Sequence, residues 1–385
     1  MFSKQLHNSK PKDMELNIEK KSIIDVYDTP IIQQTSFWSR VKRKQGLQSF
    51  AFDYKARNSD LYLNVGGYSY TRADFLMFLQ YFNENDCVAY VPYGPEIEPS
   101  EENQGAFLEE LSESLRSYLP KECIAIRYDL NWRSHWGKDC DYTEDGRWLG
   151  APENKYQEFK LNFDTCNRNL IKSNNNILPA NTIIVNLNST PQDILAHMKP
   201  KTRYNIGLAS RKGVDVRLGT INDLKIWYDL YLETAQRNGL HINDIKYFHS
   251  VFAAKMEDKE MPVHVKLLIA YVDNVPLAAM FLLISSHRAT YLYGASSSVM
   301  RNFMPTYAMQ WQAIQIAKAY GCSEYDMFGI APNAELSHPM YGLYKFKSGF
   351  GGEIFHQMGC WDYPLKRDEF SLFQACEMSN KGYYL

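Results

Sequence analysis

The chain has 385 residues, which is long enough for two domains, and 45% of them are hydrophobic, which supports full-sized cores. Its 42 Lys and Arg residues nearly balance 44 Asp and Glu residues, for a net charge of -2. This balance argues against a generally basic protein that coats nucleic acid, so we expect no DNA partner, although a local basic patch could bind RNA or a phosphate-bearing substrate. No apolar run approaches the roughly 20 residues of a spanning helix, and Met1–Asn8 lacks a signal peptide's apolar core, so we expect a cytoplasmic protein.

The pattern of cysteines and histidines indicates neither a metal site nor a nucleophile. The seven cysteines have no paired short spacing, which is typical of reduced thiols, and the nine histidines have no metal-ligand spacing. The sequence contains no Gly-x-Ser-x-Gly elbow. We therefore expect no metal.

The first part of the chain predicts mixed strands and helices. Residues 1–22 are polar and lysine-rich and indicate a flexible tail. Thr35 or Ser36 can cap a short helix through Val41, whose outer side carries a basic cluster that also fits a solvated face. Further predictions are strands at 48–54, 61–65, 87–91 and 123–128, helices at 72–83 and 104–119, an irregular insertion at 131–160 and a turn at 173–176. This mixture predicts an α/β layer around a central sheet.

A second unit begins near residue 181. We predict strands at 182–185, 214–218, 265–271, 277–284, 289–293 and 323–327, and helices at 191–211, 224–237, 247–256 and 306–320. Three successive strands, a helix and another strand form the order of an acyltransferase domain of the GNAT type. The first unit has a looser version of that order.

The run from Tyr341 to Gly352 sets two lysines among aromatic residues and ends in a glycine cluster. If it is extended, Lys345 and Lys347 share one face and Phe346 lies on the other. The glycines would let the backbone turn tightly or approach a ligand closely. A held ammonium can stabilise an oxyanion during acyl transfer, whereas the alternative is an edge strand protected by lysine.

The loop Arg301–Thr306 lies where an acetyl-CoA-dependent enzyme would present glycine-rich backbone amides to the cofactor's pyrophosphate. It contains no glycine, and Phe303 and Pro305 would obstruct a close backbone approach. We predict an acyltransferase shape that does not use acetyl-CoA, and we expect no cofactor.

Several separate motifs together resemble one known family. They are Trp38–Lys42, Tyr90–Pro95, Lys199–Ile206, Tyr291–Ser297, Gln310–Trp311, Tyr325–Ile330, Phe346–Lys347 and Gly349–Gly352. In this order they resemble the FemABX family of non-ribosomal peptidyltransferases over roughly residues 30 to 365. The resemblance implies two GNAT-like domains that face a cleft, at 23–180 and 181–357, with a segment 358–385 that returns to the first domain.

The resemblance also implies a reaction. An aminoacyl-tRNA would donate its ester-linked amino acid to an amine on the stem peptide of a peptidoglycan precursor, either UDP-MurNAc-peptide or lipid II. A lipid-linked acceptor would bring the protein to the inner membrane surface as a peripheral partner. The alternatives are an N-acyltransferase of similar shape acting on a polysaccharide or small amine, and a non-catalytic module that binds precursor or tRNA.

Three residues carry the implied catalysis. Lys347 would stabilise the oxyanion of the tetrahedral intermediate, and Phe346 would shape the donor channel or serve as a core aromatic. Asp129 would orient the acceptor amine or accept its proton, with loop capping as the alternative.

Other residues carry the implied binding. Lys42, after Trp38, resembles the family lysine that contacts precursor phosphates. Tyr247 and Tyr293 are placed like cleft tyrosines, with core packing as the alternative. Arg203 is a basic candidate for tRNA or lipid phosphate, as is Lys201, although a solvated helix face explains both. Asn243 stands where family members often have an arginine, so the expected phosphate contact is incomplete or rebuilt through Arg40, Arg43 or Lys246, with Arg237 the nearest upstream arginine.

Overall fold

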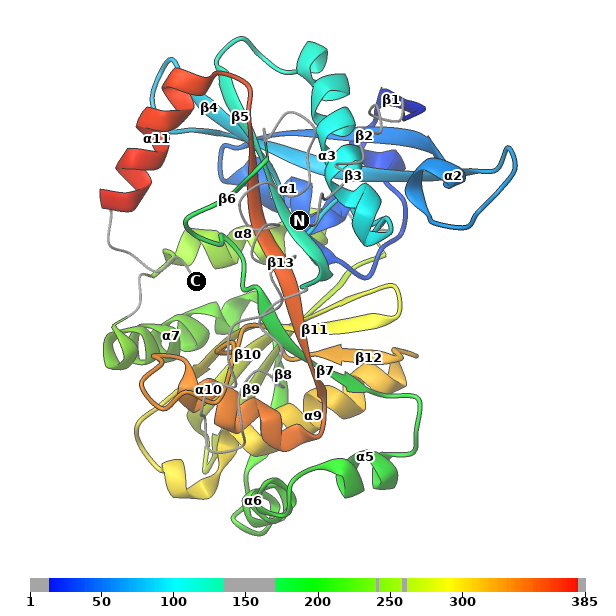
Figure 1. Ribbon diagram of the computed structural model, residues 1–385. Helices are drawn as coiled ribbons and strands as arrows, with labels where there is room; N and C mark the ends of the chain where they lie inside the picture. The colour runs from blue at the N-terminus through cyan, green and yellow to red at the C-terminus, as the bar shows by residue number, and fades with distance from the viewer. Residues whose placement is uncertain (1–13, 135–169, 240–241, 258–261, 380–385) are drawn as a thin grey trace, which may run out of the picture.

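A single 13-stranded sheet runs through the molecule and joins its two halves (Figure 1). The computed structural model describes residues 14–134, 170–239, 242–257 and 262–379. The strand order is β1-β2-β3-β4-β5-β13-β7-β12-β11-β10-β9-β8, with β6 paired to β13. The β4–β5 and β11–β12 pairs are parallel, whereas the other pairs are antiparallel. The predicted α/β class is confirmed.

The first half consists of β1–β5 and the helices between them. Its elements are β1 (Leu16–Lys21), η1 (Ile23–Asp25), η2 (Ile32–Gln34), α1 (Ser36–Lys44), β2 (Gln48–Arg57), α2 (Asn58–Leu61), β3 (Tyr70–Tyr81), β4 (Cys87–Val91), α3 (Glu101–Leu115), η3 (Arg116–Tyr118) and β5 (Cys123–Arg133). Thr35 caps α1, since its side chain accepts a hydrogen bond from Trp38 N at 3.3 Å. The predicted helix at α1, helix at α3 and strands at β2, β4 and β5 are therefore present.

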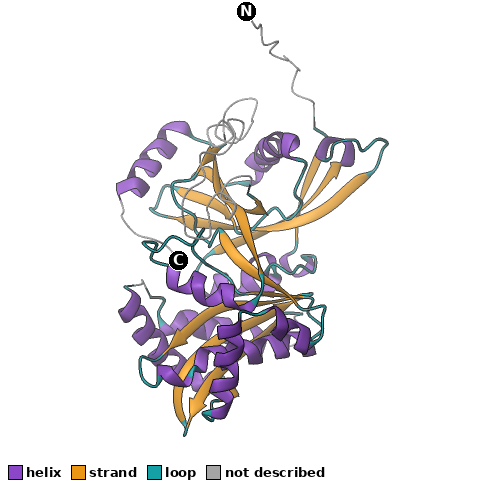
Figure 2. Ribbon diagram, turned by 60° about the horizontal axis from the view of Figure 1, so that its bottom comes forward, coloured by secondary structure: helices purple, strands orange, loops and turns teal. Residues whose placement is uncertain are grey.

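The second half consists of β7–β12 with helices on both faces of its sheet (Figure 2). Its elements are β7 (Asn181–Asn186), α5 (Pro191–His197), α6 (Pro200–Arg211), β8 (Asp215–Gly219), η5 (Ile221–Asp223), α7 (Leu224–Asn238), α8 (Ile245–Glu257), β9 (His264–Val272), β10 (Val275–Ser285), β11 (Arg288–Ser296), η6 (Arg301–Phe303), α9 (Pro305–Ala319) and β12 (Glu324–Asp326). Strand β10 is a nearly continuous buried apolar run because both of its faces are covered. The three central strands and the helix that follows them confirm the predicted element order.

The last part of the chain ties the halves together. After α10 (Tyr341–Lys347) and η7 (Ser348–Phe350), strand β13 (Glu353–Pro364) pairs first with β7 and then with β5. Helix α11 (Arg367–Ser379) follows, and its Glu377 accepts hydrogen bonds from Arg127 of β5. A short strand, β6 (Ile171–Lys172), lies beside β13. The C-terminal segment thus completes the sheet of the first half, while the boundaries predicted for the two domains stay a prediction.

Three hydrophobic cores position the site. One lies under α3 in the first half, and another lies between α9 and the strands of the second half. The third contains Phe37, Trp38 and Val41 of α1 together with Trp227 of α7 and Phe248 of α8. This third core, the seam core, therefore spans both halves, and α1 contacts α8 across it.

Three sequence predictions of secondary structure were wrong in the first half. Residues 72–83 were predicted as a helix, but β3 is a strand that pairs with β2 and β4, and its residues 75–79 are all buried. A continuous apolar run does not distinguish a buried strand from a helix, and tertiary pairing decided it here. The predicted strand at 61–65 does not form. The predicted flexible tail contains β1, which pairs with β2, while residues 1–13 lie outside the described residues, as does most of the predicted insertion at 131–160.

In the second half, the single helix predicted at 191–211 is two helices. Met198 and Lys199 have extended ψ angles of 151° and 145°, and Pro200 follows them. A proline disfavours the helical conformation of the residue before it, so α5 ends before Pro200. Pro200 then occupies the first position of α6, where a proline is tolerated.

Candidate functional site

Lys347 is a buried ammonium held by two backbone carbonyls. Its side chain is 5% exposed, and Nζ donates hydrogen bonds to Phe328 O at 3.0 Å and Gly329 O at 2.8 Å. Burial lowers the pKa of Lys347 to about 7, while the charge of Asp326 acts in the opposite direction. Loss of the proton therefore falls close to neutral pH at this position.

The strand predicted around Lys347 was wrong. Residues 341–347 form helix α10, and Lys345 is exposed while Lys347 is buried. Residues two apart point in different directions on a helix, so the two lysines do not share a face as predicted. The arrangement separates one solvent-facing cation from one buried cation.

The glycines after Lys347 make room for protein atoms. A Cβ on Gly349 would lie 2.3 Å from Thr202 Oγ1, and one on Gly351, which has φ of 77°, would lie 2.6 Å from His197 O. A Cβ on Gly352 would lie 2.7 Å from Ile184 O. The close backbone approach predicted for these glycines therefore exists. In the described structure the glycines approach protein atoms of α6, of the end of α5 and of β7.

Phe346 lies in an aromatic cluster beside the buried lysine. Its ring centroid is 5.0 Å from that of Tyr307 and 5.3 Å from that of Phe350, and both pairs are edge-to-face. The cluster packs against the core on the α9 side. Packing of α10 through Phe346 fixes the direction in which Lys347 leaves the helix.

The carbonyls that bind Lys347 come from a turn with unusual backbone geometry. Phe328 has φ of 58°, in the left-handed region that non-glycine residues rarely adopt. Asp326 holds this turn, because its Oδ1 accepts hydrogen bonds from Phe328 N at 2.8 Å and from Thr182 Oγ1. Tyr93, with φ of 46°, packs edge-to-face on Phe328 at 6.3 Å between ring centroids. The strained turn is thus supported from both halves.

Asp129 is fully buried on β5. It accepts hydrogen bonds from Tyr90 Oη at 2.9 Å and from Leu178 N at 3.0 Å, and burial raises its pKa while these bonds oppose that rise. Pro179, which follows Leu178, lies against Gly329, since a Cβ on Gly329 would be 3.0 Å from Pro179 Cγ. Asp129 therefore holds the segment that packs on the Lys347 turn.

A second lysine site lies on the seam core. Lys42, on α1, has its Nζ 5.2 Å from the ring centroid of Trp38 and 5.3 Å from that of Tyr247 on α8. Tyr247 and Tyr293 of β11 share a hydrogen bond between their hydroxyl groups. Burial raises the pKa of Tyr247 to about 12 and that of Tyr293 further, so both stay neutral. The structure brings these four predicted residues together.

Lys42 has an amide, Gln45, as its polar partner. Its Nζ donates to Gln45 Oε1 at 3.2 Å, and no ion pair to Lys42 occurs among the described residues. Burial lowers the pKa of Lys42 to about 8. A half-buried cation without a carboxylate partner is a ready counter-ion for an anionic ligand. Gln45 was not predicted as a site residue, although its position at the helix end, three residues after Lys42, was a usable signal.

The two lysine sites border the same seam core but are built differently. Tyr247, Tyr293 and Phe328 all pack against that core. No described contact links Lys42 directly to Lys347. The structure therefore places Phe346 and Lys347 in one site, and Trp38, Lys42, Tyr247 and Tyr293 in a neighbouring one.

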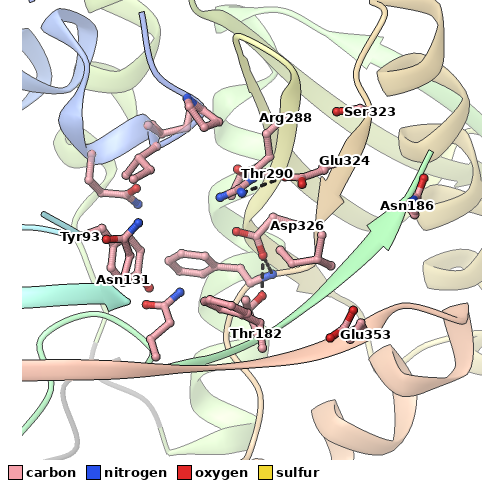
Figure 3. A pocket seen from close by; sticks show the side chains of 18 of the residues that line it. Tyr93, Asn131, Thr182, Asn186, Arg288, Thr290, Ser323, Glu324, Asp326 and Glu353 are labelled. Atoms are coloured by element: carbon pink, nitrogen blue, oxygen red, sulfur yellow. Dashed lines mark hydrogen bonds and ion pairs between the residues drawn. The ribbon is translucent and has the colours of Figure 1, made fainter. Parts of the chain in front are cut away.

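A pocket of about 510 Å³ lies between the halves and beside the strained turn (Figure 3). Tyr93 and Asn131 line it from the first half, and Thr182, Asp326 and Arg288 line it from the second (Figure 3). Arg288 is paired with Glu324 at 2.8 Å. None of the predicted site residues lines this pocket, whose contact with the Lys347 site runs through Asp326 and Phe328.

The FemAB family model matches residues 26–273 and 254–378, which together cover most of the chain. The chain belongs to the FemAB family. The resemblance inferred from the motifs is thereby confirmed.

Individual relatives of this FemAB-family chain are distant. The lipid II:glycine glycyltransferase of Staphylococcus saprophyticus is 23% identical over 255 residues, a match that covers 51% of this chain and 61% of the relative. The protein with the same name from Staphylococcus aureus is 22% identical over 260 residues, covering 51% and 62%. The chain thus matches about three fifths of the length of these curated relatives. A crystal structure of FemX superimposes with a TM-score of 0.68 at 18% identity, covering 92% of this chain and all of that chain, and shows the shared fold.

The basic residues expected near the family's phosphate position are arranged differently here. Asn243 donates its backbone N–H to Tyr231 Oη at 3.4 Å. Arg237 donates to Ser296 O at 2.9 Å and Ser298 Oγ at 3.2 Å, so it holds the end of β11. Arg203 donates to the carbonyls of Ala196 and Met198 and holds the turn between α5 and α6. Arg203 therefore binds backbone carbonyls of the α5–α6 turn.

Among the described residues, no group of three or more His, Cys, Asp or Glu side chains is placed to hold a metal ion. No helix within the described ranges combines the length and apolarity needed to cross a membrane.

Proposed function

We propose that this FemAB-family chain is an aminoacyltransferase that moves an amino acid from aminoacyl-tRNA to an amine on the stem peptide of a peptidoglycan precursor. The observation that carries the proposal is the buried Lys347 ammonium, fixed by two carbonyls of a strained turn. The names of the curated relatives, which are lipid II:glycine glycyltransferases, support this reaction class and a lipid-linked acceptor. A lipid-linked acceptor would make the protein peripheral to the membrane.

The reaction needs a positive charge near the ester carbonyl. The acceptor amine attacks that carbonyl, and the π electrons of the C=O bond move to the carbonyl oxygen. When the intermediate collapses, the C–O bond to the tRNA ribose breaks, and the proton lost by the amine balances the one gained by the departing ribose hydroxyl. Lys347 already uses two of its three N–H groups on Phe328 O and Gly329 O. The third N–H is our candidate donor to the oxyanion, and the fixed carbonyls keep it in place.

Phe346 and Asp129 would act through position. Phe346 anchors α10 in its aromatic cluster and so directs Lys347, as well as forming one wall of a donor channel. Asp129 is enclosed by Tyr90 and Leu178, which favours the loop-holding role over direct contact with the acceptor amine. We propose Asp129 as a positioning residue whose loss would loosen the turn that binds Lys347.

The second lysine site would bind the acceptor. We assign the Lys42 ammonium to an anionic group of the precursor, its diphosphate, with Trp38, Tyr247 and Tyr293 forming the surrounding aromatic wall. A compact ammonium acts as a point charge on phosphate oxygens. Arg203 is assigned to positioning α6 near the donor, since its guanidinium is bonded to backbone carbonyls.

The test is a transfer assay with purified protein. Radiolabelled amino acids charged on a mixed tRNA pool would be offered with UDP-linked and lipid-linked precursors. We expect label on the stem peptide that is lost when the donor is treated with ribonuclease beforehand. The Lys347→Ala variant should give none, whereas Lys345→Ala, a matched change on the exposed side of α10, should resemble the wild type. Product with acetyl-CoA and none with aminoacyl-tRNA would contradict the proposal.

A further inference from the structure

Helix α6 lies at one edge of the molecule (Figure 1). Its charged residues are all basic. Between Asp193 and Asp215 the sequence has no acidic residue, and it has five basic ones: Lys199, Lys201, Arg203, Arg211 and Lys212. Exposed lysines and arginines elsewhere are often paired, as Lys225 is with Asp229 and Arg217 with Asp215. No ion pair to Lys201 or Arg211 occurs in the part of the chain that the structure describes.

The exposed face of α6 combines these cations with an aromatic ring. Lys201, Tyr204 and Arg211 lie on one side of the helix, because their spacing follows its turns. Tyr204 is 60% exposed, and the guanidinium of Arg211 lies 5.8 Å from its ring centroid. The opposite side of α6 buries Thr202, Asn205 and Ala209. We call Lys201, Tyr204 and Arg211, with the flanking Lys199 and Lys212, the α6 face.

The α6 face leads directly to the buried lysine. At its start, Lys199 N donates to Gly349 O at 2.8 Å and Lys199 Nζ donates to Ser348 Oγ at 3.3 Å. Ser348 is the next residue after Lys347. At its other end, Lys212 Nζ donates to Asn302 O at 3.0 Å and lies over the ring of Phe303 at 4.7 Å. A ligand lying along the face would therefore end beside the proposed catalytic lysine.

The chemistry of the face fits a polynucleotide. Basic side chains that track a phosphate backbone, combined with an exposed aromatic ring for base stacking, are the features of single-stranded nucleic-acid binding. An anionic bilayer would also attract the cations, but it favours several apolar side chains that can be inserted. Among the described residues of α6, one large hydrophobic side chain is exposed, that of Tyr204. RNA is thus the better match.

We propose that the α6 face is the docking surface for the acceptor end of tRNA, with the 3′ end directed toward Lys347. This inference rests on the proposed function, because it assigns a surface to the donor of that reaction. Arg203 is excluded from the contact set, because its guanidinium is engaged with the backbone of the α5–α6 turn.

The test measures binding of deacylated, fluorescein-labelled bulk tRNA by anisotropy over a range of KCl concentrations. In the Lys201→Glu/Arg211→Glu variant we expect Kd to rise at least tenfold, and the salt slope to fall by about 1.4 to 1.8 if two phosphate contacts are lost. Tyr204→Ala should weaken binding about fivefold or more through lost stacking. The control variant Arg72→Glu/Lys121→Glu makes the same charge change on exposed residues of the first half and should bind within twofold of the wild type.

A second readout separates this proposal from the proposed function. The ratio of kcat/KM for aminoacyl-tRNA to kcat/KM for a short aminoacyl dinucleotide should fall tenfold or more in the Lys201→Glu/Arg211→Glu variant, because the short donor lacks the acceptor arm. If that variant folds poorly, Lys201→Gln/Arg211→Gln gives the same comparison without charge reversal. If either variant bound tRNA with the affinity and salt slope of the wild type, the α6 assignment would be overturned. The proposed transfer reaction would still stand. The α6 assignment would also be overturned if the variants lost binding to phosphatidylglycerol vesicles but kept wild-type binding to tRNA. Absence of transfer with every donor would instead overturn the proposed function.

Discussion

The two lysine sites use the same side chain under different constraints. Lys347 is enclosed, with its Nζ bonded to two backbone carbonyls, and burial lowers its pKa to about 7. Lys42 is half-buried in an aromatic wall with an amide partner, and burial lowers its pKa to about 8. A cation fixed by rigid backbone suits a charge that develops during reaction, whereas a cation on a wall suits a charge that the ligand brings with it.

The largest expected effect is on the chemical step. Lys347→Ala should lower kcat by about 10² to 10³, the range found when one preorganised donor to an oxyanion is removed. Binding of the precursor, followed by calorimetry, should change little because Lys42 is intact. A variant that keeps its kcat but loses precursor affinity would reverse the roles assigned to the two sites.

Removal of the second lysine should act on binding. Lys42→Ala should raise the KM for the precursor about 10- to 100-fold, as expected for loss of a charge-assisted hydrogen bond, with kcat within about threefold of the wild type. Lys44→Ala is the matched control on the same helix, since Lys44 is paired with Glu257. A fall in kcat with KM unchanged would contradict the assignment of Lys42.

The pH dependence should separate the sites as well. Because Lys347 is active as the ammonium, kcat should fall as pH rises through about 7, and Lys347→Arg, which stays charged, should lose that descending limb in its residual activity. The Kd for the precursor should rise as pH increases through about 8, where Lys42 loses its proton. A kcat that increases through pH 7 and then stays level would indicate that Lys347 acts as a neutral base.

The same shift gives a stability prediction with a defined sign. An unfolded lysine keeps its proton up to about 10.5, whereas folded Lys347 loses it at about 7. The unfolded state therefore binds more protons between these values, and the stability of the wild type relative to Lys347→Met should increase with pH across that window and be lowest below it. Urea unfolding of both proteins at pH 6.5 and 9 measures this difference, and an equal difference at both pH values would show that the pKa is not shifted.

The smallest effect concerns the partner of Lys42. Gln45→Glu places a carboxylate where Lys42 Nζ now meets an amide oxygen, so the pKa of Lys42 should rise and the new ion pair should compete with the ligand. We expect the precursor KM to rise about 3- to 10-fold, given the modest strength of partly exposed ion pairs. An unchanged KM would mean that the ligand's anion is bound elsewhere.

The sequence predicted most members of the two lysine sites but not all of the contacts around them. Trp38, Lys42, Tyr247 and Tyr293 were predicted as binding residues and lie together. Trp38 and Lys42 are one turn apart on α1, whereas Tyr247 and Tyr293 join them through the packing of α8 and β11. Gln45 was missed, since its amide matters only through its contact with Lys42. The pocket lined by Asp326 and Tyr93 was also missed, because it forms where the two halves meet and no local pattern reports that meeting.

The errors in secondary structure have the same origin. Helix α10 was predicted as a strand, yet its Phe346 packs against Tyr307 of α9 and against Phe350 of η7, the turn that follows α10. Strand β3 was predicted as a helix, yet it is held between β2 and β4. In both places a short apolar segment took the conformation that its neighbours in space required. The order of strands and helices in the second half was largely predictable because its main elements, α7, α9, β9 and β10, are long.

The most direct test of the account is a single-turnover measurement, with enzyme in excess of aminoacyl-tRNA and precursor at saturating concentration. The account predicts a transfer rate at least 10² lower in Lys347→Ala and close to the wild-type rate in Lys42→Ala, since saturation removes the binding defect. A wild-type rate in Lys347→Ala, or an equal loss in both variants, would contradict the division between a reacting lysine and a binding lysine.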